Sequence, residues 1–133
     1  MLDSSPGQSL SVGVDLVELD RRARAVARFG DRFLARIYTP EELRRYRERL
    51  PELAARFAAK EAVTKALGTG IWREGIGWTD IAVGRDVETG APILKLYGAA
   101  QRRADALGLS TWSISLSHDR ERAIAFVVAM GEA

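Results

Sequence analysis

Two carboxylates stand where the surrounding pattern favours apolar side chains. Asp15 lies inside the apolar stretch LSVGVDLVEL, and Glu61 follows Leu53 and Phe57 at helical spacings of eight and four residues. Each carboxylate needs a partner, because an unpaired charge on an apolar face is costly. Two carboxylates in one place are also what Mg²⁺ uses when phosphate oxygens and water complete its octahedron.

Glu61 has two possible partners, and the sequence leaves both open. Lys65 lies one turn later, in the Glu-before-Lys order that favours an ordinary ion pair on a helix. Alternatively, Glu61 shares a metal ion with Asp15.

The residues that follow Glu61 suggest phosphate binding. Lys60 and Lys65 supply mobile positive charges, and the segment Gly68, Thr69 and Gly70 lets backbone N–H groups approach an anion. Gly68 is explained equally well as the residue that ends a helix. The order of lysine and glycine excludes a Walker loop, in which the glycines precede the lysine.

His118, the single histidine, lies in SLSHD, where an imidazole could donate to a phosphate or carry a proton. A hydrolase built from Ser115, Ser117, His118 and Asp119 is disfavoured, because the glycines of a nucleophile elbow are missing. Three tryptophans could stack an adenine or fill the core: Trp72, Trp78 and Trp112.

The first element that positions these residues is a strand. Val12, Val14 and Leu16 alternate with smaller or polar residues, which predicts one buried face and places Asp15 on the opposite face. Asp20 is then expected to cap a short helix, residues 21–29, that stops at Gly30.

The remaining punctuation predicts an α+β fold, with a mostly antiparallel sheet packed against a long helix. Thr39, Pro40 and Glu42 form a helix start, and that helix is expected to run to about residue 50. Further elements are predicted in chain order: a long helix over 51–67, strands over 81–85 and 93–96, a helix over 97–108, and strands over 111–117 and 123–130. Residues 10–133 form one domain, and residues 1–9 form a flexible extension.

Composition narrows the class of protein. The 133 residues include no cysteine, which excludes disulfides and thiolate zinc sites and suits a reducing compartment. No signal peptide or membrane-spanning stretch is evident, so a cytoplasmic protein without membrane contact is expected. Only Lys60, Lys65 and Lys95 are lysines among the 20 basic residues, so arginine dominates the positive surface.

Arg21, Arg24 and Arg28 share one helix face by their spacing of three and four residues. Such a stripe is either a solvated surface or a docking site for an acidic partner. A noncatalytic, arginine-rich nucleic-acid-binding domain is the alternative function. It is disfavoured because no aromatic RNA-binding motif accompanies the arginines.

Together, three segments resemble the holo-acyl-carrier-protein synthases, the short type of phosphopantetheinyl transferase. They are GVDLVEL, RFAAKEAVTKALGTG and, more weakly, SLSHD. Softer similarities, FGDRFLARIYTPEE and LYGAAQRRADALG, fall where the family has helices, so the resemblance runs from about Val12 to Val128 and implies the phosphopantetheinyl transferase fold.

The resemblance implies a complete reaction. Asp15 and Glu61 would hold Mg²⁺, and coenzyme A would lie with its pyrophosphate near the metal and Lys65, along Gly68–Gly70. A serine of an apo acyl carrier protein would attack the phosphorus that bears pantetheine, releasing adenosine 3′,5′-bisphosphate. The general base stays open between Asp15, Glu61 and a metal-bound water.

The resemblance also implies a homotrimer with active sites between subunits, and an acidic carrier protein docked on Arg21, Arg24 and Arg28. The family's G-[KR]-P turn lacks its basic residue here, where Ala91 follows Gly90, and relatives vary at His118. A relative that only binds carrier protein is disfavoured, because both metal-site carboxylates and Lys65 are present.

Overall fold

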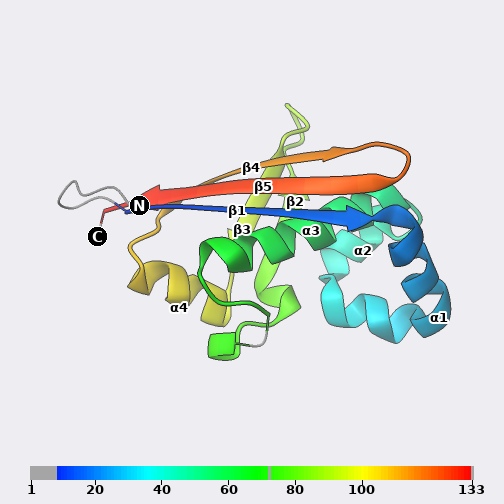
Figure 1. Ribbon diagram of the computed structural model, residues 1–133, viewed down its shortest axis with the longest axis horizontal. Coiled ribbons are helices and arrows are strands. Elements are labelled where there is room, and N and C mark those ends of the chain that lie inside the picture. Colours follow the sequence, from blue (N-terminus) through cyan, green and yellow to red (C-terminus); the bar gives the residue numbers. More distant parts are fainter. Residues whose placement is uncertain (1–8, 72, 133) are drawn as a thin grey trace.

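The computed structural model describes residues 9–71 and 73–132. In chain order, the strands and helices are β1 Ser9–Glu18, α1 Leu19–Ile37, α2 Pro40–Tyr46, α3 Leu50–Ala66, β2 Ile81–Arg85, β3 Pro92–Leu96, α4 Gly98–Ala106, β4 Thr111–His118 and β5 Arg122–Gly131 (Figure 1). The expected α+β class and order of elements are confirmed.

Every strand pair is antiparallel, but the strands form two sheets. The larger sheet has the order β1-β5-β4, and the smaller one is the hairpin β2–β3. The three long strands lie along α3, while α1 and α2 gather at one end of the molecule and α4 at the other (Figure 1). The sheet therefore packs against the long helix, as the sequence predicts.

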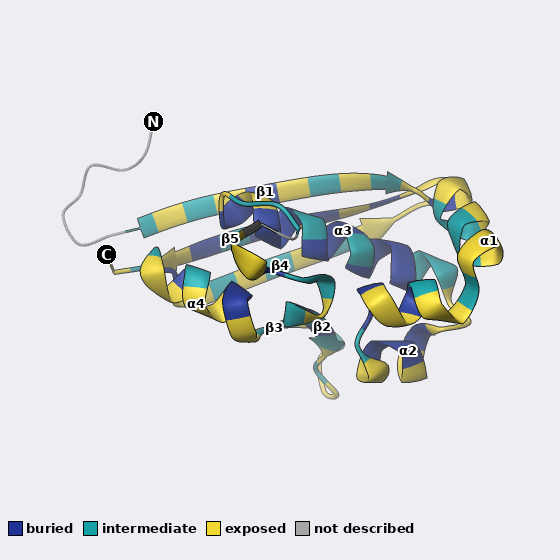
Figure 2. Cartoon of the chain, turned by 90° about the horizontal axis from the view of Figure 1, so that it is seen from below, coloured by how far each residue is buried: buried dark blue, intermediate teal, exposed yellow. Residues whose placement is uncertain are grey.

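Helix α3 is the centre of the core. It is alanine-rich, and most of its length is buried (Figure 2). Its buried alanines are Ala54, Ala55, Ala58, Ala59, Ala62 and Ala66. Alanine favours the helical conformation, and its small side chain lets a neighbouring backbone come close to the helix without leaving voids.

Strand β1 uses this space at Gly13. A Cβ on Gly13 would overlap the carbonyl oxygen of Ala62, and it would also lie 3.1 Å from the backbone nitrogen of Ala66. Nearby, the Ser11 hydroxyl donates to the carbonyl of Ala66 at 2.6 Å. Glycine at position 13 is thus what allows strand and helix backbones to touch.

The two faces of β1 differ from the prediction. The alternation is present, but the face that carries Gly13 and Asp15 packs on α3, and the face of Val12, Val14 and Leu16 is exposed. The expectation that the apolar face is the buried one is wrong for the isolated chain. The reason is steric, because β1 lies so close to α3 at Gly13 that even a Cβ there would overlap the helix backbone.

Helix α1 is longer than predicted. It begins after Glu18 and reaches Ile37, although Gly30 interrupts it with a left-handed φ of 69°. Asp20 is therefore not the cap but lies in the first turn, where its carboxylate pairs with Arg24. Glycine permits this sharp change of direction without ending the element.

Helix α2 begins as predicted and ends early. Thr39 accepts from the backbone of Glu42 at 3.2 Å, and the Glu42 carboxylate accepts from the Thr39 N–H at 2.9 Å, so the capping box is complete. The helix stops at Tyr46 instead of continuing to residue 50.

Two further expectations concern the N-terminal extension and membrane-spanning segments. The predicted extension, residues 1–9, lies outside the described residues except for Ser9, which starts β1 opposite Gly131. Among the residues described, no helix is long and apolar enough to cross a bilayer.

We expect Gly13→Ala to lower stability by about 1–3 kcal/mol or more, because a methyl group would meet backbone atoms that cannot move aside. Urea unfolding measures the change. Gly84→Ala is the matched control, since that glycine lies in β2 and a Cβ there would meet nothing within 4 Å. Equal stability of the two variants would contradict the close approach.

Candidate active site

Asp15 and Lys65 meet where β1 crosses α3. The Lys65 ammonium lies 3.1 Å from Asp15 Oδ1 and donates to the carbonyl of Val14 at 3.0 Å. Lys65 is largely exposed, whereas the Asp15 side chain is mostly covered. The lysine partner that the sequence offered to Glu61 is thus paired with Asp15, 50 residues away along the chain.

Glu61 lies beside this pair and is half-buried. Burial raises the pKa of Glu61, and the charge of Asp15 raises it further, while Lys65 and Arg22 lower it. The two predicted carboxylates therefore lie close enough to repel each other. Two carboxylates that repel each other are stabilised by a cation placed between or beside them.

The donor set fits Mg²⁺. Within residues 9–71 and 73–132, no group of three or more His, Cys, Asp or Glu side chains could hold a metal. A zinc-type cage is therefore not formed by the described residues. Two carboxylates leave the other positions to water and phosphate oxygens, which is the pattern of a substrate-bound Mg²⁺ site.

Lys60 does not join this site. It is fully buried, and its ammonium donates to Glu42 at 2.8 Å and to the carbonyls of Ile81 and Trp78. Glu42 also accepts from the backbone N–H of Val83 at 2.8 Å. The geometry does not support the expected phosphate contact of Lys60, because helical rotation directs it away from Glu61 and into the interior.

The predicted ligand loop follows α3 directly. Gly68 and Gly70 both have positive φ, 73° and 143°. The hydroxyl of Thr69 is buried without a hydrogen-bond partner among the described residues. An unsatisfied buried hydroxyl is unusual and marks this loop as a place where a ligand group could bond.

His118 and the tryptophans are placed differently. His118 is exposed at the end of β4, and β5 separates it from β1, so it lies outside the Asp15–Glu61 group of its own chain. Trp78 stacks on Phe57 with ring centroids 4.8 Å apart, and Trp112 packs against the core. Trp72 lies outside the described residues.

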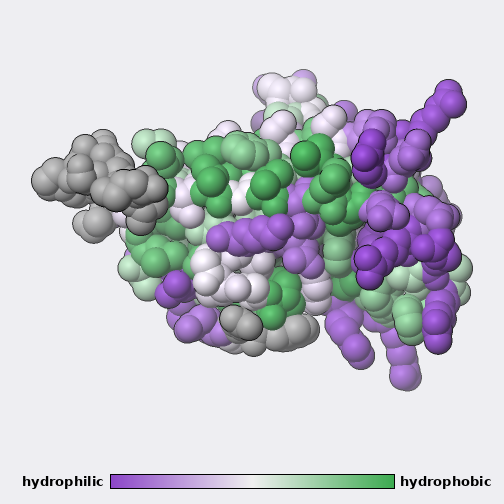
Figure 3. Space-filling view, viewed as in Figure 1, coloured by the Kyte–Doolittle hydropathy of each residue, from purple (hydrophilic) through white to green (hydrophobic). Residues whose placement is uncertain are grey.

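Arg21, Arg24 and Arg28 are all exposed on α1 before its break at Gly30. Hydrophilic side chains gather at the α1 end of the molecule (Figure 3). Arg28 rests on the ring of Phe29 at 5.3 Å.

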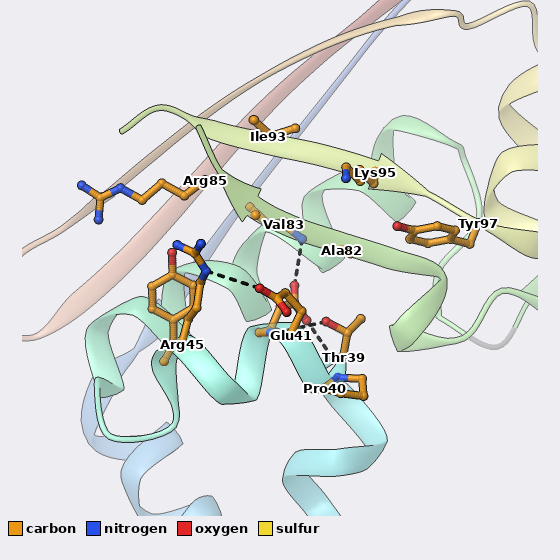
Figure 4. A pocket seen from close by; sticks show the side chains of 13 residues that line it. Thr39, Pro40, Glu41, Arg45, Ala82, Val83, Arg85, Ile93, Lys95 and Tyr97 are labelled. Atoms are coloured by element: carbon orange, nitrogen blue, oxygen red, sulfur yellow. Dashed lines mark hydrogen bonds and ion pairs between the residues drawn. The ribbon is translucent and has the colours of Figure 1, made fainter. Parts of the chain in front are cut away.

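A cavity of about 550 Å³ lies apart from these residues, between α2 and the hairpin β2–β3 (Figure 4). Arg45, Arg85, Lys95 and Tyr97 are among its lining residues, and Arg45 pairs with Glu41 at 3.5 Å. None of the predicted site residues lines it. The candidate chemistry is therefore on the open surface where β1 crosses α3.

Comparison with known proteins gives the class of this chain. The model of the 4′-phosphopantetheinyl transferase superfamily matches residues 11–127, which is most of the sequence. The chain therefore belongs to this superfamily.

Within the superfamily, its relatives are holo-[acyl-carrier-protein] synthases. One from Herpetosiphon aurantiacus is 51% identical over 129 residues, which cover 92% of this chain and 99% of that protein. The crystal structure of the Neisseria meningitidis enzyme has a TM-score of 0.80 at 39% identity and covers 90% of this chain and 96% of that one. The Helicobacter pylori enzyme in complex with coenzyme A has a TM-score of 0.79 at 34% identity and covers 89% and 98%.

We expect Glu61→Gln to make the metal-free protein more stable at pH 7, by a few degrees in Tm. The pKa of Glu61 is raised in the folded state, so its contribution to stability is present at low pH and lost as pH rises through that pKa. Removing the charge relieves this loss, and the advantage should vanish near pH 4.

Thermal unfolding from pH 4 to 8 in the presence of a chelator checks this prediction. Glu88→Gln is the control, because Glu88 is exposed in the turn between β2 and β3. A glutamine variant that is less stable than the wild type at pH 7 would contradict the repulsion between Glu61 and Asp15.

Proposed function

We propose that the protein transfers 4′-phosphopantetheine from coenzyme A to a serine of an apo acyl carrier protein, with Mg²⁺, and releases adenosine 3′,5′-bisphosphate. The observation that carries the proposal is the meeting of Asp15, Glu61 and Lys65 at the crossing of β1 and α3. Membership of the superfamily and the coenzyme A complex of a relative support it.

Asp15 and Glu61 would hold Mg²⁺. The bound metal would neutralise negative charge on the phosphate oxygens. Lys65 binds and orients the pyrophosphate, since its exposed ammonium already lies at the site. Transfer of this kind needs mainly positioning and charge neutralisation. The serine proton goes to Asp15, Glu61 or a water.

The loop Gly68–Gly70 would lie along the substrate. Its backbone has the open conformations that glycine allows, and the unpartnered Thr69 hydroxyl can donate to a phosphate or pantetheine oxygen. Both properties support the ligand role that the sequence predicts for this loop.

The acidic carrier protein would dock on Arg21, Arg24 and Arg28. These residues are exposed on α1, which begins four residues after Asp15, so a partner bound there is close to the site. A nucleic-acid role is less well supported, because the exposed face of the larger sheet is apolar and offers no basic stacking surface.

The exposed face of the larger sheet supports self-association, which the homotrimer implied by the sequence resemblance requires. Large apolar side chains of β1 and β5 lie side by side there (Figure 3): Leu10, Val12, Val14, Leu16, Ile124, Phe126 and Met130. A continuous apolar surface of this extent is typical of subunit contacts.

Incubation with coenzyme A, Mg²⁺ and an apo carrier protein tests the function. We expect the intact mass of the carrier to rise by one phosphopantetheine group. Asp15→Asn and Glu61→Gln should abolish the gain, because each removes one of only two metal-ligating carboxylates. Near-normal Mg²⁺-dependent turnover in either variant would refute the assigned site.

We expect the double variant Val14→Glu and Phe126→Glu to be monomeric, because charges cannot be buried unpaired in an apolar contact. Sedimentation velocity at micromolar concentration measures this. Phe29→Glu is the control, since Phe29 is at least as exposed as Val14 and Phe126 but lies on α1. A wild-type protein that is an active monomer would rule out the shared site.

A further inference from the structure

Arg22 occupies a place that the roles above do not explain. It lies on α1 beside the exposed arginines but is half-buried, and its guanidinium carbon is 4.2 Å from the centroid of the Phe57 ring on α3. The Phe57 ring in turn stacks on Trp78. Arg22 is thus the outer layer of a three-part stack that joins α1 to α3.

The stack places the positive charge of Arg22 beside Glu61. Phe57 and Glu61 are four residues apart on α3, so they lie on the same face one turn from each other. Lys65 lies one turn further on. Glu61 therefore has Lys65 on its C-terminal side and Arg22 over the turn on its N-terminal side.

The two cations differ in what they can still offer a ligand. The Lys65 ammonium already donates to Asp15 and to the carbonyl of Val14. Arg22 makes no hydrogen bond or ion pair with any group in the described ranges. Stacking uses only the flat face of a guanidinium and leaves its N–H edges free, and those edges fit phosphate oxygens.

We propose that Arg22 is a second phosphate-binding residue, which contacts the pyrophosphate of the substrate from the side opposite Lys65. This inference rests on the proposed function. Arg22 belongs to the same helix as the exposed arginines. One face of α1 would therefore bind the carrier protein, and the face that carries Arg22 would bind the phosphate.

Arg22→Met and Arg22→Lys test the inference. Methionine keeps an aliphatic chain over Phe57 but removes the charge, and lysine keeps the charge but loses the planar fork. Arg36→Gln is the matched control, because Arg36 is exposed near the end of the same helix. Isothermal titration of each variant with coenzyme A and Mg²⁺ gives the Kd, and urea unfolding gives the stability.

We expect Arg22→Met to weaken coenzyme A binding about tenfold or more, as the loss of a charged hydrogen bond predicts. Arg22→Lys should recover part of the affinity, and Arg36→Gln should bind like the wild type. In steady-state kinetics, the KM for carrier protein should change little in Arg22→Met.

The docking arginines should behave in the opposite way. Reversal of Arg21 and Arg24 to glutamate should raise the KM for carrier protein well over tenfold and flatten its salt dependence, since surface charges act mainly on encounter. Its Kd for coenzyme A should stay at the wild-type value.

Two results would overturn the inference, and they are distinguishable. Wild-type affinity for coenzyme A in Arg22→Met, with or without a lower unfolding midpoint, would reduce Arg22 to a packing residue and leave the proposed function intact. Failure of the wild-type protein to bind coenzyme A at all would remove the proposed function and the role of Arg22 with it.

Discussion

The contact between Gly13 on β1 and Ala62 on α3 is the constraint on which the site depends. Because neither residue places a bulky group at the crossing, the strand lies directly on the helix backbone. Asp15 follows Gly13 by two residues, on the same strand face, and Glu61 precedes Ala62 by one. The contact that packs β1 on α3 therefore also brings together two carboxylates that are far apart in the sequence.

A second constraint fixes the rotation of α3. Lys60 and Arg56 are buried on the side of α2 and β2, where Lys60 pairs with Glu42 and Arg56 donates to the carbonyl of Val83 at 3.0 Å. Burial lowers the pKa of Lys60, and Glu42 opposes that shift. Removing one partner of such a pair leaves the other charge buried, so the register of the helix is strongly held. Neighbouring Glu61 is consequently held at the surface beside β1.

The surface of the isolated chain is divided into two regions of opposite character. Arginines are exposed at the α1 end, and apolar side chains are exposed along β1 and β5 (Figure 3). The first region suits an acidic partner that is bound and released, and the second suits a permanent contact between copies. The candidate site, where β1 crosses α3, is near both regions, because Asp15 lies on β1 and four residues before α1 begins.

The sequence by itself determined the order of the elements and the α+β class, and it predicted Asp15, Glu61 and Lys65 as site residues, because capping boxes such as that of Thr39 and side-chain periodicity are local signals. It could not determine that Lys60 is buried against Glu42, that Lys65 pairs with Asp15, or which face of β1 is covered. Those depend on partners 18 to 50 residues away and on which side chains fit beneath a strand. Arg22 carried no local signal at all, since its ring partner belongs to another helix. Only the packing of α1 on α3 decided its place, because a cation–π contact is set by tertiary geometry.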